Sequence, residues 1–268
     1  MPSGYIDLHC HWIPNIDDGA RSVEDGLRML AELGALGFRT VVATPHMRPG
    51  LFDNTRVDLE NAYAQVQPVV VSKPDLPQIA LSSEHYLDDT VFQRLLAGSG
   101  LPYPGGRAVL IELSPVECPS LLDYRLVDLC RHRLIPVIAH PERNAGFQKD
   151  HQTLLEWIRQ GALAQVDAGS LTGMFGKPCQ IFSEHLLRAG AVHLVASDAH
   201  RDQGRNFLVL GHAYKKVEAL TDSETAKKLF VDNPRCLWEG RPLAPGIPDE
   251  SAFKLSFVDK IRRLLSTP

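Results

Sequence analysis

The sequence has no long hydrophobic run, little cysteine and no excess of positive charge, and each absence excludes a class of protein. No apolar stretch approaches the roughly 18 residues that a membrane-spanning helix needs. The five cysteines in 268 residues include no Cys-x-x-Cys pair, so a disulfide framework is not predicted. A formal net charge of -4 provides no basic field for nucleic acids. We therefore expect a cytoplasmic protein without a nucleic-acid partner or stable membrane insertion.

The cysteine pattern also excludes one kind of phosphatase. An enzyme that attacks phosphate through a thiolate needs a phosphate-cradling loop and an arginine six positions after the cysteine. The residues at that distance from the five cysteines are Ile16, Tyr124, Pro136, His185 and Pro242. None of them is arginine, so a covalent cysteine mechanism is rejected.

Short apolar, β-branched runs alternate with helical patterns along the chain, which is typical of βαβ units. The predicted strands are 5–11, 40–44, 78–82, 108–112, 136–140, 164–167 and 193–197. The first intervening helix is expected between Ser22, which can cap it, and Gly37. Seven strands predict an α/β barrel over residues 1–240. Residues 241–268 are expected to form a Gly/Pro-rich linker and a C-terminal helix.

Potential metal ligands stand where the predicted strands end. His9 and His11 project from one face of the first strand, while Cys10 points away. Other strand ends carry His46, Glu84, Glu112, His140, Asp198 and His200. Either Asp17 or Asp18 adds a carboxylate from the first loop. Because the carboxyl ends of barrel strands share one rim, these side chains should converge.

Five histidines and four carboxylates are more ligands than one ion can use. A site for several metal ions is therefore predicted. Nitrogen and oxygen ligands without thiolate suit Mn, Fe or Zn, and the ligand types do not choose among them.

In combination and order, these motifs resemble those of the bacterial capsular-polysaccharide protein-tyrosine phosphatases of the polymerase and histidinol phosphatase (PHP) superfamily. The similarity runs from about Tyr5 to Trp238. It is carried by the segments 7–11 (DLHCH), 16–19 (IDDG), 42–46 (VATPH), 137–143 (VIAHPER), 196–200 (ASDAH) and 232–235 (DNPR).

The resemblance implies a distorted (β/α)7 barrel of the PHP type with three divalent ions, most often Mn. It assigns His9, His11 and Asp198 to the first ion. Glu84 bridges to a second ion held by Glu112 and His140. Asp18, rather than Asp17, joins His46 and His200 at the third. Arg143 and Arg205 match the family's phosphate-binding arginines.

Two positions depart from the family pattern. His85 follows the bridging Glu84 and could line the mouth of the site. Asp167 stands where the family has asparagine, which would place an extra negative charge near the phosphate.

The activity implied is hydrolysis of phosphotyrosine in a protein, such as a bacterial tyrosine kinase that controls capsule or exopolysaccharide synthesis. The alternatives are a small-molecule phosphatase of the histidinol-phosphate type and a catalytically inactive metalloprotein that binds phosphotyrosine. An oligomer is compatible with the sequence.

Overall fold

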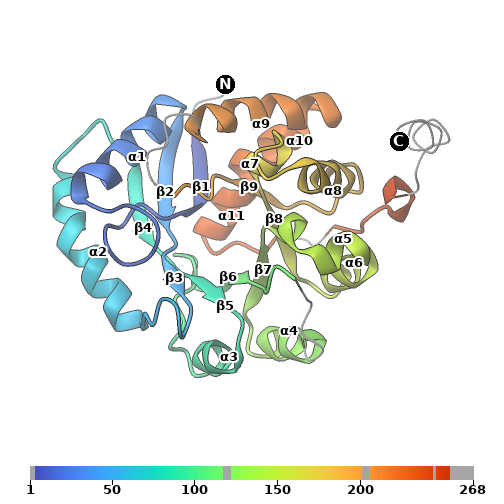
Figure 1. Cartoon of the computed structure of the whole chain (residues 1–268), viewed down its shortest axis with the longest axis horizontal. Coiled ribbons are helices and arrows are strands. Elements are labelled where there is room, and N and C mark those ends of the chain that lie inside the picture. Colours follow the sequence, from blue (N-terminus) through green and yellow to red (C-terminus); the bar gives the residue numbers. More distant parts are fainter. Residues whose placement is uncertain (1–3, 117–121, 201–205, 244–245, 254–268) are drawn as a thin grey trace.

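The computed structural model describes residues 4–116, 122–200, 206–243 and 246–253. Its strands lie at the centre and its helices form a ring around them (Figure 1). The described strands are β1 (Tyr5–Cys10), β2 (Phe38–Ala43), β3 (His46–Met47), β4 (Gln78–Leu81), β5 (Glu84–Tyr86), β6 (Ala108–Glu112), β7 (Ile135–Ala139), β8 (Leu163–Asp167) and β9 (Leu194–Ala196).

Every strand pairing in the described residues is parallel, in the orders β1-β2-β4 and β3-β5-β6-β7-β8-β9. The nine strands occupy seven positions around the barrel, because two predicted strands are each followed by a second short one. Pro45 lacks an N–H donor and separates β2 from β3. Ser82 and Ser83 separate β4 from β5.

The barrel closes between its first and last strands. The backbone N–H of His11 donates to the carbonyl of Ala199 at 2.9 Å, and that of Asp198 donates to the carbonyl of His9 at 2.9 Å. The predicted α/β barrel of the PHP type is confirmed. Closure brings the first and last ligand motifs of the sequence side by side.

The surrounding helices are α1 (Val23–Ala35), α2 (Arg56–Val71), α3 (Asp89–Leu96), α4 (Leu122–Arg131), α5 (Ala145–Lys149), α6 (His151–Arg159), α7 (Ala168–Leu171), α8 (Lys177–Arg188), α9 (Asn206–Leu220), α10 (Ser223–Lys227) and α11 (Asn233–Trp238). The short 3-10 helices η1 (Pro141–Arg143) and η3 (Glu250–Phe253) and the short π-helix η2 (Lys228–Asp232) complete the described elements. As predicted, Ser22 caps α1: its hydroxyl accepts from the N–H of Asp25 at 3.2 Å. None of the helices in the described ranges is long and apolar enough to span a membrane.

Alternate residues of the strands pack into two apolar clusters. In β6, for example, Leu110 joins the inner cluster with Leu8 and Val137, whereas Val109 and Ile111 join the outer cluster beneath the helices. The inner cluster fills the barrel with hydrocarbon. The polar residues are thereby concentrated at the carboxyl ends of the strands.

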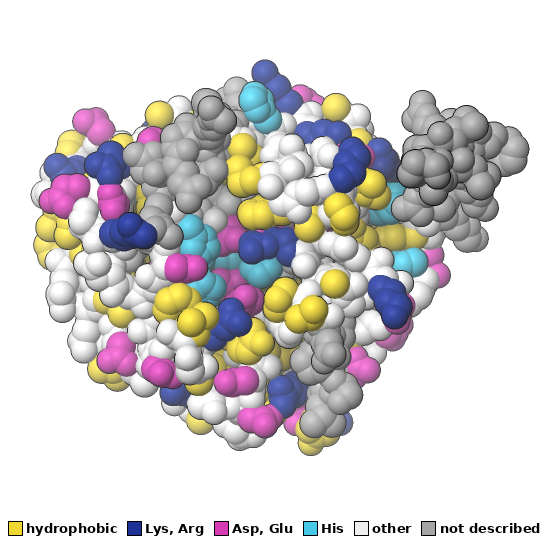
Figure 2. All heavy atoms as spheres, viewed as in Figure 1, with side chains coloured by type: hydrophobic (Ala, Val, Ile, Leu, Met, Phe, Trp, Pro, Cys, Tyr) yellow, Lys and Arg dark blue, Asp and Glu magenta, His cyan; other side chains and the backbone are white. Residues whose placement is uncertain are grey.

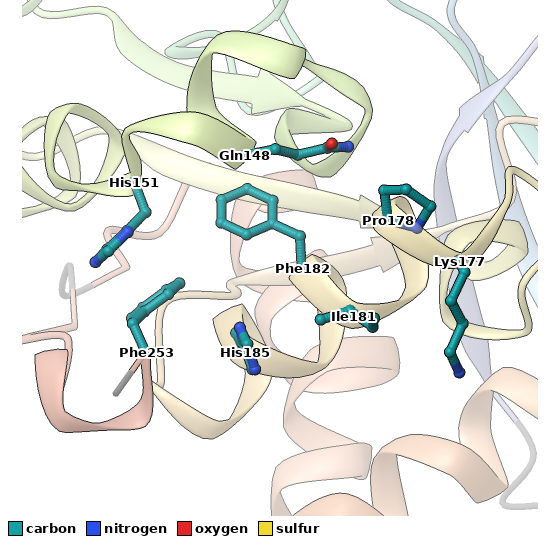
Figure 3. A pocket seen from close by; sticks show the side chains of 8 residues that line it. All are labelled: Gln148, His151, Lys177, Pro178, Ile181, Phe182, His185 and Phe253. Carbon is teal, nitrogen blue, oxygen red and sulfur yellow. The ribbon is translucent and has the colours of Figure 1, made fainter. Parts of the chain in front are cut away.

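The predicted C-terminal helix lies mostly outside the described residues, which end at Phe253. Within them, the Phe253 ring stacks on His151 of α6, with centroids 4.1 Å apart, and lies 6.1 Å from Phe182 of α8. These rings line a cavity of about 440 Å³. Figure 3 shows how they lie around it. The described part of the segment after the barrel therefore contacts α6 and α8.

Candidate metal centre

The two histidines at the end of β1 face the same space. Their Nε2 atoms are 3.2 Å apart, and both rings are buried. Cys10, between them, is buried in the outer apolar cluster. The alternation expected from strand geometry therefore holds, and the thiol lies outside the imidazole pair.

Two buried carboxylates approach the same pair. Nε2 of His9 lies 3.2 Å from Oε2 of Glu84 and 3.2 Å from Oδ1 of Asp198. Nε2 of His11 lies 3.5 Å from the same two oxygens. These four residues form a group in which one atom from each could bind a common ion.

A second group lies beside the first, towards solvent. Oδ1 of Asp18 is 3.5 Å from Nε2 of His46 and 3.2 Å from Nε2 of His200. The ring of His200 stacks on that of His11 with centroids 4.0 Å apart. His11, Asp18, His46 and His200 thus form another potential ion site.

Glu112 and His140 complete the cluster on its other side. Oε2 of Glu112 lies 3.7 Å from Nδ1 of His46, and these two residues form a third potential group with Glu84. His140 belongs to none of the three groups in the described residues, but its Nε2 lies 2.9 Å from Oε1 of Glu84. All nine predicted ligands therefore meet at one rim, where Figure 2 shows histidines among acidic and basic side chains.

The donor atoms of this cluster fit cations. Four buried atoms of the cluster have no hydrogen-bond partner among the described residues: Nδ1 of His46, Oε2 of Glu84, Oε2 of Glu112 and Oδ1 of Asp198. Buried polar atoms are normally paired, because an unpaired one keeps the full cost of losing water. Oxygen and imidazole donor atoms that converge in this way are arranged as metal ligands are.

The electrostatics of the cluster favour positive charge. Burial alone would lower the pKa of His9, but the carboxylates of Glu84 and Asp198 outweigh it and raise that pKa to about 9. Burial likewise opposes the shift at His140, where Asp167 and Glu84 raise the pKa to about 10. In the protein without ions, protons on histidine would therefore balance the carboxylates.

Two of the predicted ligands have a left-handed backbone. His140 has φ of 32° and Asp198 has φ of 47°, at the ends of β7 and β9. Residues other than glycine seldom adopt this region, and such conformations cluster at functional sites. The backbone is bent at the two points where strand ends must turn side chains into the cluster.

Arg143 reaches the cluster. Its Nη1 donates to Oδ2 of Asp198 at 2.7 Å and to Oδ2 of Asp167 at 3.0 Å. Asp167 therefore pairs with an arginine rather than standing as an isolated charge. Arg205 lies outside the described residues.

His85 does not line the mouth of the site. It is fully buried, Nδ1 lies 2.9 Å from the carbonyl of Leu110, and Nε2 accepts from the N–H of Leu101 at 3.0 Å. Burial lowers its pKa to about 4, so the ring is neutral and joins β5 to its neighbours. The expectation of a site residue here is wrong, because β-strand alternation turns His85 away from Glu84.

Two supporting residues, Gln165 and Asp17, hold the imidazoles and were not predicted in that role, and a third, Asp7, joins β1 to the segment after β9. Oε1 of Gln165 lies 2.7 Å from Nδ1 of His9. Oδ2 of Asp17 lies 2.7 Å from Nδ1 of His11 and accepts from the N–H of His46 at 3.1 Å. Asp7 accepts from the N–H of Ser197 at 3.0 Å. Gln165 could have been noticed as an amide within a buried strand, where an unpaired polar group is costly.

Sequence comparison places the chain among known proteins. Residues 5–239 match the family described as "Capsular polysaccharide synthesis, CpsB/CapC". Tyrosine-protein phosphatase YwqE of Bacillus subtilis is 36% identical over 203 residues, covering 75% of this chain and 80% of the relative. Tyrosine-protein phosphatase CpsB of Streptococcus pneumoniae is 29% identical over 235 residues, covering 86% of this chain and 96% of the relative.

Comparison with solved structures supports the same family. A crystal structure from work on YwqE and CpsB, described there as unique metal-dependent tyrosine phosphatases, has a TM-score of 0.84 at 32% identity. It covers 91% of this chain and 98% of the other. The histidinol phosphate phosphatase of Lactococcus lactis shares the fold alone, with a TM-score of 0.52 at 13% identity over 82% of this chain and 95% of the other. This chain belongs to the CpsB/CapC family of capsular polysaccharide synthesis proteins.

Proposed function

We propose that this protein is a metal-dependent protein-tyrosine phosphatase whose divalent ions are held by the nine converging rim residues. The observation that carries this proposal is the group of buried nitrogen and oxygen atoms that face one another without hydrogen-bond partners. The relatives named tyrosine-protein phosphatases support the reaction.

We propose three ions, assigned to the nine residues as the family resemblance implies. His9, His11 and Asp198 would hold the first, with Glu84 bridging to a second beside Glu112 and His140. Asp18, His46 and His200 would hold the third. Mn is the metal we favour, and the same nitrogen and oxygen set would accept Fe or Zn.

Divalent ions bound there would lower the pKa of water to supply a nucleophile at neutral pH and would neutralise charge on the phosphoryl oxygens. The role of Arg143 is to bind phosphoryl oxygens. Its contacts to Asp198 and Asp167 use Nη1 alone, and a guanidinium has five N–H donors in a fixed plane. Arg205, outside the described residues, is proposed for the same task. A tyrosine leaving group has a pKa of about 10, so no general acid is assigned.

The proposed substrate is phosphotyrosine in a protein, with a bacterial tyrosine kinase of capsule or exopolysaccharide synthesis as the partner. The family description and the names of the relatives support this assignment. We also propose a cytoplasmic location. The similarity to the histidinol phosphate phosphatase is limited to the fold. Histidinol phosphate is therefore kept as the alternative substrate and is included in the test.

The test is phosphate release from a phosphotyrosine peptide, a phosphoserine peptide of the same sequence and histidinol phosphate. Each is assayed with the Mn-loaded protein, and His140→Ala serves as the inactive control. We expect the phosphotyrosine peptide to have the highest kcat/KM, by at least tenfold. A higher kcat/KM for histidinol phosphate would replace the proposed substrate, whereas no turnover of any of the three would contradict the enzyme assignment.

A further inference from the structure

A cavity of about 250 Å³ opens beside the metal ligands Glu112 and His140. Two arginines, Arg48 and Arg143, also line it, and the remaining lining includes the apolar side chains of Leu113, Pro115, Pro141 and Phe147. An apolar cavity of ~150 Å³ is enough for a benzene ring. The space therefore suits a single aromatic ring attached to a phosphate that sits at the ions.

Arg48 is held in place by its surroundings. Its backbone N–H donates to the carbonyl of Phe52 at 3.0 Å, which closes a turn after β3. Its guanidinium carbon lies 4.2 Å from the centroid of the Tyr86 ring, and Nη1 is 3.5 Å from Oε1 of Glu112. The ring of Phe52, across the turn, stacks on His46 with centroids 5.2 Å apart. One end of the turn therefore contacts the proposed ligand Glu112 through Arg48, and the other end contacts His46 through Phe52.

A guanidinium that rests on one aromatic ring can offer its remaining surface to another. Cation–π contacts of arginine with aromatic rings are favourable, and more so where water is excluded. An alkyl phosphate would gain nothing from such a contact.

We propose that Arg48, supported by Tyr86, is a specificity-determining residue that packs against the phenyl ring of the substrate in this cavity. This inference rests on the proposed phosphotyrosine phosphatase function and adds the group that distinguishes an aryl from an alkyl phosphate. Arg48 contacts the ring, whereas Arg143 contacts the phosphoryl group.

The test measures binding of phenylphosphonate and methylphosphonate, because neither is hydrolysed and leaving-group effects are absent. Dissociation constants are obtained by calorimetry on Mn-loaded wild type, Arg48→Ala, Tyr86→Leu and the control Arg188→Ala. Arg188 pairs with Glu184 at 3.5 Å at the end of α8, just before β9 begins, and so lies at the opposite end of the barrel from the ligand rim.

We expect wild type to prefer phenylphosphonate by roughly tenfold. Arg48→Ala should remove most of this preference and change methylphosphonate binding by less than about twofold, and Tyr86→Leu should weaken the preference in the same sense. The control should match wild type.

Equal weakening of both phosphonates by Arg48→Ala would place Arg48 on the phosphoryl group and overturn the inference. Loss of bound metal in Arg48→Ala would show that Arg48 acts by positioning Glu112, and this result would also overturn the inference. If wild type hydrolyses the phosphotyrosine peptide yet shows no phenyl preference, the inference fails while the proposed function stands. If wild type binds neither phosphonate and hydrolyses no peptide, the proposed function itself fails.

Discussion

Gln165 fixes the orientation of His9, because its side-chain oxygen lies 2.7 Å from Nδ1 of that imidazole. The amide nitrogen of Gln165 in turn donates to Oδ1 of Asp167 at 2.9 Å. The carbonyl oxygen can only accept, so the hydrogen of the neutral imidazole lies on Nδ1. Nε2 is then left as the lone-pair donor that faces the carboxylates.

Replacing Gln165 should therefore weaken metal binding without removing a ligand. We expect Gln165→Leu to lower the affinity for Mn by about 10- to 100-fold, the usual cost of losing a residue that orients a metal-binding histidine. Metal titration followed by calorimetry measures it. Gln160→Ala, on the exposed end of α6, is the control, and equal affinity in Gln165→Leu and wild type would contradict this role.

Arg143 should contribute to turnover through the phosphoryl group. Arg143→Ala is expected to lower kcat/KM for the phosphotyrosine peptide by roughly 10²-fold or more, the scale of a charged contact in a preorganised site. Arg143→Lys should recover only part of the loss, since lysine cannot bind two oxygens with one planar group. Metal analysis of the same samples should match wild type and Arg188→Ala. Metal loss in proportion to activity would show that Arg143 acts through Asp198 instead.

Gly19 allows the loop that carries Asp17 and Asp18 to pass close to β1. A Cβ atom at this position would lie 2.0 Å from the carbonyl oxygen of His11 and 2.9 Å from Oδ1 of Asp17. Gly19→Ala must therefore displace the loop, and we expect at least a tenfold loss of activity together with bound metal. Gly98→Ala is the matched control: its φ is 73°, with nothing within 4 Å of the added atom. It should cost about 1 kcal/mol of stability and no activity. An active Gly19→Ala protein with full metal would refute this account of the loop.

His193, at the opposite end of β9 from the cluster, should make stability depend on pH. Burial, and then the charge of Lys228, lower its pKa to about 4, and its Nδ1 accepts from the N–H of Ala164 at 3.1 Å. In the unfolded chain this pKa is near 6.5, so between pH 6.5 and 4 the unfolded state binds the extra proton. Acidification therefore favours unfolding.

Urea unfolding at pH 7 and pH 5 tests this dependence. Wild type should lose about 2 kcal/mol more than His193→Gln over that interval. The comparison removes the contribution of the metal ligands, which both proteins share. An identical loss in the two proteins would contradict the lowered pKa of His193.

The barrel and the convergence of the nine rim residues were predictable because they depend on local pattern. Strand ends supply His9, Glu84 and Asp198, and parallel topology alone brings strand ends together. Pro45 was the only sequence signal that the second predicted strand would be divided into β2 and β3. It was harder to predict which side chains of a short strand face the cluster. A shift of one residue turns each side chain to the opposite face, and His85 was misplaced for this reason.

Supporting contacts could not be predicted because they join residues far apart in the chain. Gln165 and His9 are separated by 156 positions and meet only once the barrel has closed. Asp17 and Asp18 are chemically identical neighbours. Loop geometry decides that Asp17 accepts from the N–H of Gly19 at 2.9 Å and contacts His11, while Asp18 faces His46 and His200.

Metal removal and readdition test the central claim most directly. Phosphate release from a phosphotyrosine peptide should be followed on wild-type protein treated with a chelator and then titrated with Mn, with bound metal measured in the same samples. The proposed function predicts that activity falls to background as the ions are removed and returns in proportion to bound Mn. Full activity in protein shown to contain no metal would contradict it.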